Sequence, residues 1–90
     1  MAVYFNRNIK ILRFKLNKKR GRILDFTFLA ILLDFPASKL QKWERDDEPN
    51  LAELRKLAAK YSQLLETELL VNDLINRDLR YDQRFRGINT

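Results

Sequence analysis

The sequence predicts an all-α fold, a compact bundle of about five helices with a helix-turn-helix at its centre. Apolar side chains recur every three or four residues in successive segments, which is the period of an amphipathic helix. Only two Gly and two Pro occur among the 90 residues, too few for a chain with many tight turns. No segment carries the alternation and turn residues that indicate a β-hairpin.

The length predicts a single domain, and the apolar fraction of 46% is enough for one modest core. We expect residues 1–80 to form this helix-turn-helix domain. Residues 81–90 are mostly polar and contain Gly87, so they are expected to form a polar C-terminal tail.

The first helix is expected over about residues 8–18. Asn6 or Asn8 can cap its amino end through a side-chain oxygen. The apolar residues of this segment share one stripe and are expected in the core: Ile9, Leu12 and Leu16. The basic residues between them are expected on the other faces: Lys10, Arg13 and Lys15. A basic connection follows, with Gly21 as its turn point.

Asp25 is a suitable N-cap for a second helix over about residues 25–33. That segment is apolar almost all round, which indicates burial on more than one side. The third helix is expected over about residues 36–45, because Pro suits a first helical turn. One face of this third helix holds Leu40 and Trp43, and the opposite face holds small, polar and cationic side chains.

Asn50 begins the fourth helix, and Glu53 can complete a capping box with it. The inner face of this helix is expected to hold Leu51, Leu54, Leu57, Ala58 and Tyr61. The fifth helix is expected over about residues 65–79. Its apolar stripe is wider than a five-helix monomer must bury: Leu65, Leu69, Leu70, Val71, Leu74 and Ile75. We therefore expect a homodimer formed through this helix.

The net charge of +6 and the pI of about 9.9 favour a polyanionic partner, nucleic acid before any other. The charge is concentrated at the amino end, because residues 1–22 contain eight of the 18 basic residues and no acid. Together with the predicted helix-turn-helix, this charge makes double-stranded DNA the expected partner.

The composition also argues against other classes of function. Without Cys or His the chain cannot form a disulfide, a thiolate metal site or a Ser-His triad, so we expect no enzyme, no cofactor and no metal. The longest apolar run, residues 23–33, is too short to span a bilayer, and no signal-peptide pattern precedes it. We expect a cytoplasmic protein without a membrane partner.

One region resembles a known family. It consists of Leu40-Gln41-Lys42-Trp43-Glu44-Arg45, then Pro49, then the spaced set Leu51, Leu54, Leu57 and Ala58. This pattern resembles the phage-repressor/Cro-like helix-turn-helix domain, also called the xenobiotic-response-element regulator family, over about residues 8–79. The resemblance implies a lambda-repressor-like bundle and a sequence-specific DNA-binding regulator, with the helix at about 36–45 in the major groove.

The resemblance implies which side chains face the bases: Ala37, Ser38, Gln41 and Lys42. Other cations suit phosphate contacts: Lys18, Lys19, Arg20, Arg22, Lys39 and Arg45. Trp43 is expected in the core below the third helix rather than against a base. Glu44 is expected to anchor a local hydrogen bond or ion pair, because phosphate repels a carboxylate.

Two positions differ from the family pattern. Phe26 stands where members usually carry Gln against the DNA backbone, and Asp34 stands where they usually carry Gly in the turn. Phe26, Phe28 and Ile31 could pack in the core or form an exposed patch that binds a protein. The alternative function is therefore a protein-interaction module, of antitoxin or adaptor type, on a helix-turn-helix scaffold.

Overall fold

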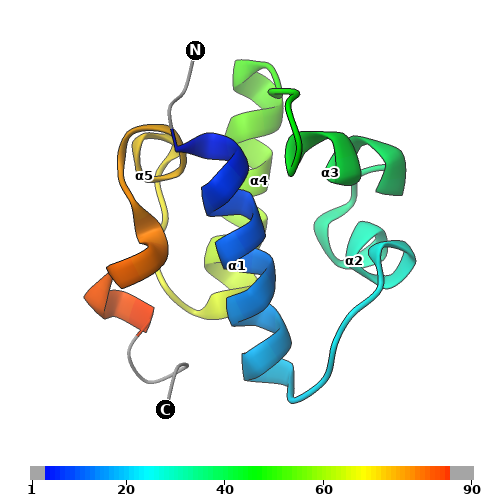
Figure 1. Cartoon of the computed structure of the whole chain (residues 1–90), viewed down its shortest axis with the longest axis horizontal. Coiled ribbons are helices and arrows are strands. Elements are labelled where there is room, and N and C mark those ends of the chain that lie inside the picture. Colours follow the sequence, from blue (N-terminus) through cyan, green and yellow to red (C-terminus); the bar gives the residue numbers. More distant parts are fainter. Residues whose placement is uncertain (1–3, 86–90) are drawn as a thin grey trace.

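A computed structural model describes residues 4–85 of the chain (Figure 1). Over this range the chain forms helices joined by short loops and contains no β-strand. Five segments are α-helices: α1 (Phe5–Arg20), α2 (Phe26–Leu33), α3 (Ala37–Trp43), α4 (Leu51–Leu65) and α5 (Val71–Asn76). Two 3-10 turns follow: η1 (Leu79–Tyr81) and η2 (Gln83–Phe85). The predicted all-α fold with five helices is confirmed.

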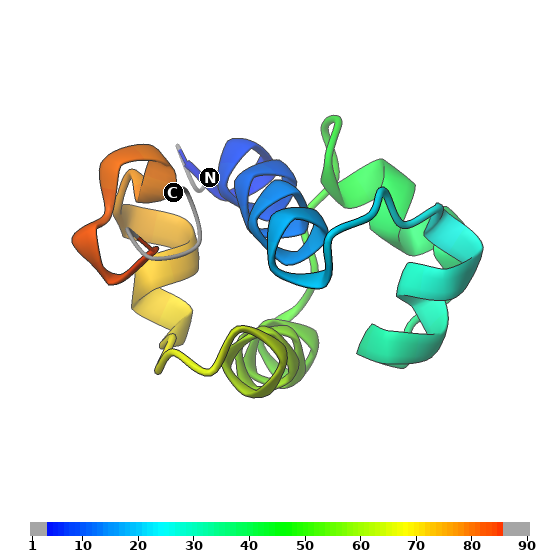
Figure 2. The same ribbon diagram turned by 90° about the horizontal axis from the view of Figure 1, so that it is seen from below.

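The helices form three groups around one core. Figures 1 and 2 show α1 and α4 in the middle, α2 and α3 on one side, and α5 with the two 3-10 turns on the other. Side chains from all of these elements meet in a single cluster, whose largest fully buried members are Trp43, Tyr61, Phe5 and Phe85. None of the helices within residues 4–85 combines the length and apolar character needed to cross a bilayer.

The helix ends follow the local sequence. The α1 helix ends at Gly21, whose φ of 71° lies in the left-handed region that favours glycine. The Asp25 carboxylate accepts a hydrogen bond from the Phe28 N–H at 2.8 Å and caps α2. Asn50 and Glu53 form the reciprocal capping box of α4, with bonds of 2.8 and 2.9 Å. These three predictions are confirmed.

Asp34 ends α2 with a left-handed backbone, at φ 59° and ψ 49°. Asp tolerates this conformation better than most residues, because its short polar side chain bonds locally. The Lys56 ammonium holds the turn, since it donates to the Asp34 carbonyl at 2.7 Å and lies 2.9 Å from the carboxylate. Pro36 then precedes α3. The chain thus reverses between two short helices within three residues.

The amino end of α1 differs from the expectation. The helix begins at Phe5 rather than at about residue 8, and neither Asn6 nor Asn8 caps it. Asn8 is instead buried inside the helix, where its amide donates to the Leu74 carbonyl at 2.9 Å and its oxygen accepts from the Leu79 N–H at 3.1 Å. This side chain therefore fastens the C-terminal segment to α1.

The C-terminal half differs more. A helix over residues 65–79 is wrong, because α4 continues to Leu65 and α5 covers only Val71–Asn76. The chain leaves α4 at Glu66, which adopts a left-handed φ of 54°. The Ser62 hydroxyl accepts from the Leu69 N–H at 2.8 Å and supports this connection.

Part of the predicted tail belongs to the core. Phe85 in η2 is fully buried, although its neighbours in the sequence are polar. Arg84 holds this segment in place: it pairs with Asp82 at 2.8 Å and with Asp73 at 3.2 Å. Residues 86–90 of the predicted tail lie outside the described residues.

Candidate functional site

The α3 helix has one buried and one exposed face, as its sequence predicts. Leu40 and Trp43 lie in the core with 1% and 2% of their surface exposed. The Trp43 ring meets the Phe35 ring edge-on, at 5.0 Å between centroids and 79° between planes. Trp43 is therefore a core residue, as expected, and anchors α3 against the domain.

Two contacts from α1 hold the carboxyl end of α3. The Arg13 guanidinium binds Glu44 through two hydrogen bonds of 2.6 and 2.9 Å. The Asn6 amide donates to the carbonyl oxygens of Trp43 and Asp47, at 2.6 and 2.8 Å. Glu44 therefore makes the local ion pair expected of it. Its hydrogen bond raises the pKa of Arg13, whose charge is retained near the core.

The opposite face of α3 is open to solvent. The side chains of Ser38, Gln41, Lys42 and Arg45 are exposed, and none bonds to another group within residues 4–85. Ala37 is half-buried at the start of the helix. These positions include the four proposed base-reading residues, and their side chains are free to meet an external partner.

Lys39 differs from its neighbours on α3. Its ammonium lies 2.6 Å from the Glu53 carboxylate, which the capping box of α4 already orients. This contact lowers the pKa of Glu53, because the hydrogen bond from Lys39 stabilises the charged form. Lys39 is half exposed and remains at the surface, but its charge is shared with an internal partner.

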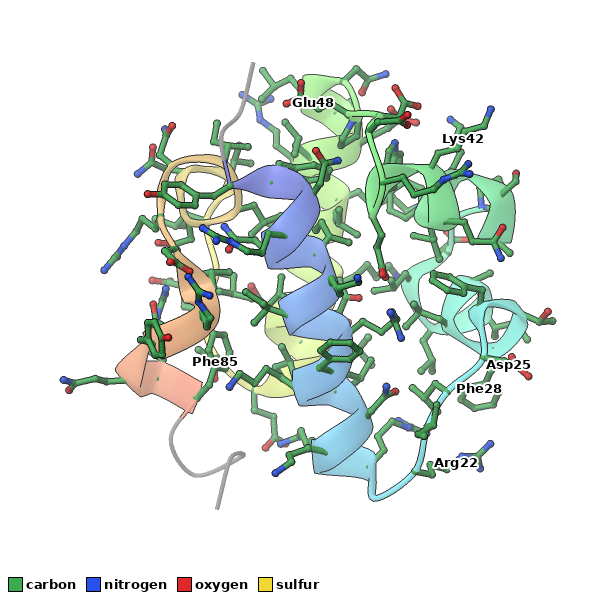
Figure 3. The ribbon with its side chains drawn as sticks, viewed as in Figure 1. Arg22, Asp25, Phe28, Lys42, Glu48 and Phe85 are labelled. Atoms are coloured by element: carbon green, nitrogen blue, oxygen red, sulfur yellow. The ribbon has the colours of Figure 1, made fainter. Side chains whose placement is uncertain are left out.

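The other predicted phosphate-binding cations lie apart from α3. Figure 3 shows Arg22 near Phe28 at the lower right, whereas Lys42 lies at the upper right. Arg20 and Arg22 both lie over the Phe28 ring, at 5.6 and 5.2 Å from its centroid. The structure therefore separates Arg20 and Arg22 from the predicted site residues of α3.

Lys18 and Lys19 complete the basic connection after α1. Lys19 pairs with Glu66 at 3.0 Å, and this carboxylate is highly exposed. Lys18 forms no ion pair with any residue in the range 4–85. Of these two cations, only Lys18 has no ion-pair partner among the described residues.

The residues of the predicted apolar patch on α2 have different surroundings. Phe26 and Phe28 are half-buried, and Arg13 lies over the Phe26 ring at 5.0 Å. Ile31 is 72% exposed. Phe26 also lines a shallow hollow of about 360 Å³ together with Lys10, Gln41, Glu44 and Arg45. Phe26 and Phe28 thus pack partly against the core, and of these three residues only Ile31 is open to solvent.

The C-terminal apolar stripe, expected to form a dimer, is largely used within the monomer. Leu69 and Leu74 are buried, and Val71 and Ile75 pack partly against the core. Leu70 remains 58% exposed at the start of α5. The surface available for a second copy at this helix is therefore small.

Sequence reasoning also missed a buried cation. Lys15 was expected to point away from the core, yet only 8% of its surface is exposed. Its aliphatic stem continues the buried stripe of α1, and its ammonium lies 5.9 Å from the Phe85 ring centroid. Its spacing of three residues from Leu12 and four from Ile11, which places these side chains on neighbouring parts of one helix face, was the available signal.

Comparison of the chain with protein-family models, with curated proteins and with solved structures finds no match.

Proposed function

We propose that α2, the turn at Asp34–Pro36 and α3 form a helix-turn-helix, and that α3 enters the major groove of DNA. On this proposal the chain is a cytoplasmic, sequence-specific transcriptional regulator and not an enzyme. The observation that carries the proposal is the face of α3, where Ser38, Gln41 and Lys42 are exposed without internal partners on a helix whose other face is anchored. An exposed, fixed helix of this kind is what major-groove recognition requires.

The side chains on this face suit base edges. Lys42 can donate to guanine O6 or N7, and Gln41 can form two hydrogen bonds with adenine. Ser38 can donate or accept, and the methyl group of Ala37 can contact the methyl group of thymine. Arg45, at the end of the same helix, is free to bind a phosphate.

The cations at the end of α1 and in the connection that follows it would contact the flanking backbone. Lys18, Arg20 and Arg22 are exposed, and the last two are held in position by Phe28. Contacts of this type add affinity without adding sequence preference. Asp25 and Phe26 lie at the start of α2, so we place no phosphate there, because a carboxylate and an aromatic ring do not attract one.

We also propose that two copies of the chain form a homodimer through α5. Two-fold proteins bind half-sites about one duplex turn apart. Leu70 is the exposed apolar residue that supports such a contact. Because this surface is small, we expect the dimer to form mainly on DNA, where two bound copies are brought together.

Selection from random duplexes at physiological salt tests the proposal. We expect one enriched motif, which Lys42→Ala relaxes at one position at a cost of about 1–3 kcal/mol of discrimination. Arg22→Ala should instead weaken binding to all sequences alike and reduce the salt slope by about 1. Arg55→Ala, in an exposed position of α4, is the matched control. If no motif is enriched, the regulator proposal fails.

The second candidate function is a protein-interaction module on the same scaffold. It is favoured by Ile31, which is 72% exposed on α2, and by Phe26 in place of a polar residue at the start of this helix. This function predicts DNA binding without sequence preference and a stoichiometric partner that Ile31→Asp releases. A selected DNA motif together with an unaffected Ile31→Asp variant would exclude it.

A further inference from the structure

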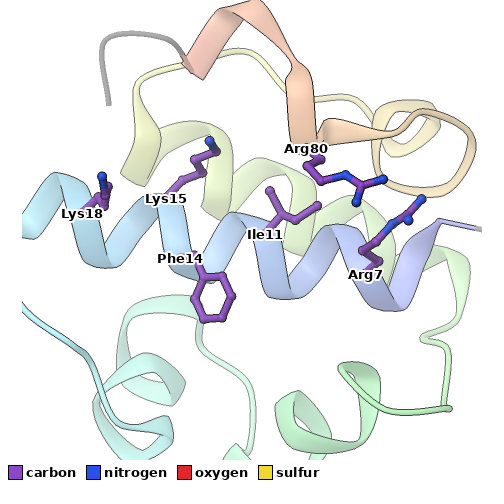
Figure 4. Close-up of a pocket in the computed structure, with 6 residues that line it drawn as sticks. All are labelled: Arg7, Ile11, Phe14, Lys15, Lys18 and Arg80. Carbon is purple, nitrogen blue, oxygen red and sulfur yellow. The ribbon is translucent and has the colours of Figure 1, made fainter. Parts of the chain in front are cut away.

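A groove runs along the exposed face of α1 next to the C-terminal segment, and its Phe14 ring points away from Arg80 of that segment (Figure 4). Its volume is about 370 Å³, and it is lined by Arg7, Ile11, Phe14, Lys15, Lys18 and Arg80. Four of these residues are cations, and none is an acid. The groove lies on a different element from the exposed face of α3, and of its six lining residues only Lys18 is also assigned to a DNA phosphate.

The centre of the groove is apolar. Ile11 is half-buried and Phe14 is 51% exposed, and they lie one helical turn apart on α1. Arg7 and Lys18 lie at the two ends of the same face, about 16 Å apart along the helix axis at 1.5 Å per residue. The surface therefore combines an apolar centre with cationic ends, over the length of about three helical turns.

Lys15 is the least exposed cation of the groove. Only 8% of its surface is exposed, and no hydrogen bond or ion pair joins its ammonium to a residue from 4 to 85. The ammonium still reaches solvent, because the Tyr61 hydroxyl is the only side-chain group within these residues that is both buried and without a hydrogen-bond partner. Burial lowers the pKa of Lys15, and the nearby charge of Lys18 lowers it further. A carboxylate brought into the groove would favour the charged form of this ammonium.

The remaining cations are less available. Arg7 and Arg80 share the Asp78 carboxylate, at 3.5 and 3.3 Å, whereas Lys18 has no such partner among the described residues. Lys15 and Lys18 are therefore the positions where an external anion gains most. They lie nearly one turn apart, a spacing that carboxylates on one face of a helix can match.

We propose that this groove binds an acidic amphipathic helix of a partner protein. Two apolar side chains of that helix, one turn apart, pack on Ile11 and Phe14, and flanking carboxylates pair with Lys15 and Lys18. A DNA backbone offers phosphates but no apolar group for the exposed Phe14 ring.

A designed peptide of about 12 residues tests this proposal. It is helical, with two Leu one turn apart and Glu on both sides of them, and its fluorescence anisotropy is followed with the full chain. A second peptide has the same Leu residues and Lys in place of Glu. We expect the acidic peptide alone to bind, with amide shifts in the NMR spectrum centred on Ile11, Phe14 and Lys15.

Variants separate this role from a purely structural one. Lys15→Met and Phe14→Ala should each weaken the acidic peptide by about tenfold or more, and Arg55→Met, on exposed α4, should not. Lys15→Met keeps an unbranched apolar side chain beside Phe85 and removes an ammonium that has no partner within residues 4–85, so the free protein should be about as stable as the wild type. A merely structural Lys15 would instead make that variant less stable.

Three results would overturn the proposal. The first is equal binding of the acidic and basic peptides, and the second is acidic-peptide binding that survives Lys15→Met. The third is a Lys15-dependent interaction with phosphatidylserine vesicles or with a DNA duplex but not with the acidic peptide. Failure here leaves the DNA selection unaffected, because that experiment depends on α3 and Lys42.

Discussion

Arg13 of α1 and Glu44 at the end of α3 form a two-point ion pair, with Nε–Oε2 and Nη2–Oε1 distances of 2.6 and 2.9 Å. Both side chains are largely buried, with 14% and 7% of their surface exposed. Since α3 is the proposed recognition helix, this pair connects its orientation to α1. A planar guanidinium binds a carboxylate in one plane, so the pair fixes the orientation of the Glu44 carboxylate as well as its distance from Arg13.

Glu44→Gln should therefore lower the free energy of unfolding by about 1–3 kcal/mol, because the Arg13 charge is left without its partner. Urea unfolding measures this change. The single variants Arg13→Met and Glu44→Leu each leave one unpaired charge, whereas the double variant Arg13→Met/Glu44→Leu leaves none. The double variant should therefore lose less stability than the sum of the losses of these two single variants. Strict additivity would show that the two side chains do not interact.

Phe85→Ala should cost about 3 kcal/mol, because a fully buried ring is removed from the core. Tyr81→Ala is the matched control: this ring is 79% exposed in the neighbouring 3-10 turn, and its loss should change stability by no more than about 0.5 kcal/mol. Equal effects of the two substitutions in thermal unfolding would mean that residues beyond 80 are a free tail after all.

Gly21→Ala should lower stability by about 1 kcal/mol through the backbone alone. A Cβ at this position meets no atom within 4 Å, so no steric clash adds to the cost of a left-handed φ. Gly21→Asn should cost less, because Asn tolerates this region better. If Ala is as stable as Gly in urea unfolding, the left-handed cap of α1 is not formed in solution.

Stability should fall as the pH drops from about 4 to about 2, partly through Asp82. The hydrogen bond from Arg84 lowers the pKa of Asp82 from its ordinary value of 3.8 to about 2. A carboxylate that is more acidic in the folded state adds stability above its unfolded pKa, and this gain is lost as pH falls through the folded pKa.

Asp73 in the same network acts in the same direction. Burial alone would raise the pKa of Asp73, but the Leu70 N–H and the Arg84 guanidinium together lower it. Urea unfolding across this pH range should show a shallower decline for Asp82→Asn than for the wild type. Asp46→Asn, in the exposed loop after α3, should retain the wild-type slope, and identical slopes for both variants would contradict the assignment.

The parts of the fold that could be predicted depend on neighbours in the sequence. The caps at Gly21, Asp25 and Asn50 involve residues within a few positions of one another, so local chemistry specifies them. The C-terminal half could not be predicted in this way. Its apolar residues keep a helical spacing across Glu66, yet the left-handed turn there divides them between α4 and a short α5.

In the candidate site, too, local features could be predicted and distant contacts could not. The exposed and buried faces of α3 follow from the helical spacing of its apolar residues, so the exposed side chains of this helix could be predicted. The internal partners of its charges were not, because Lys39 meets Glu53 and Arg13 meets Glu44 only after the helices pack. The burial of Lys15 and Phe85 likewise depends on a segment that folds back onto α1 from far along the chain.

The side-chain amide of Asn8 joins α1 to the C-terminal segment. Its partners include the carbonyl oxygen of Leu74 and the N–H of Leu79, which lie 66 and 71 positions further along the chain. While that segment is undocked, the amide has neither of these partners. A long loop must close before the contact is gained, so we expect this docking to be a slow step of folding.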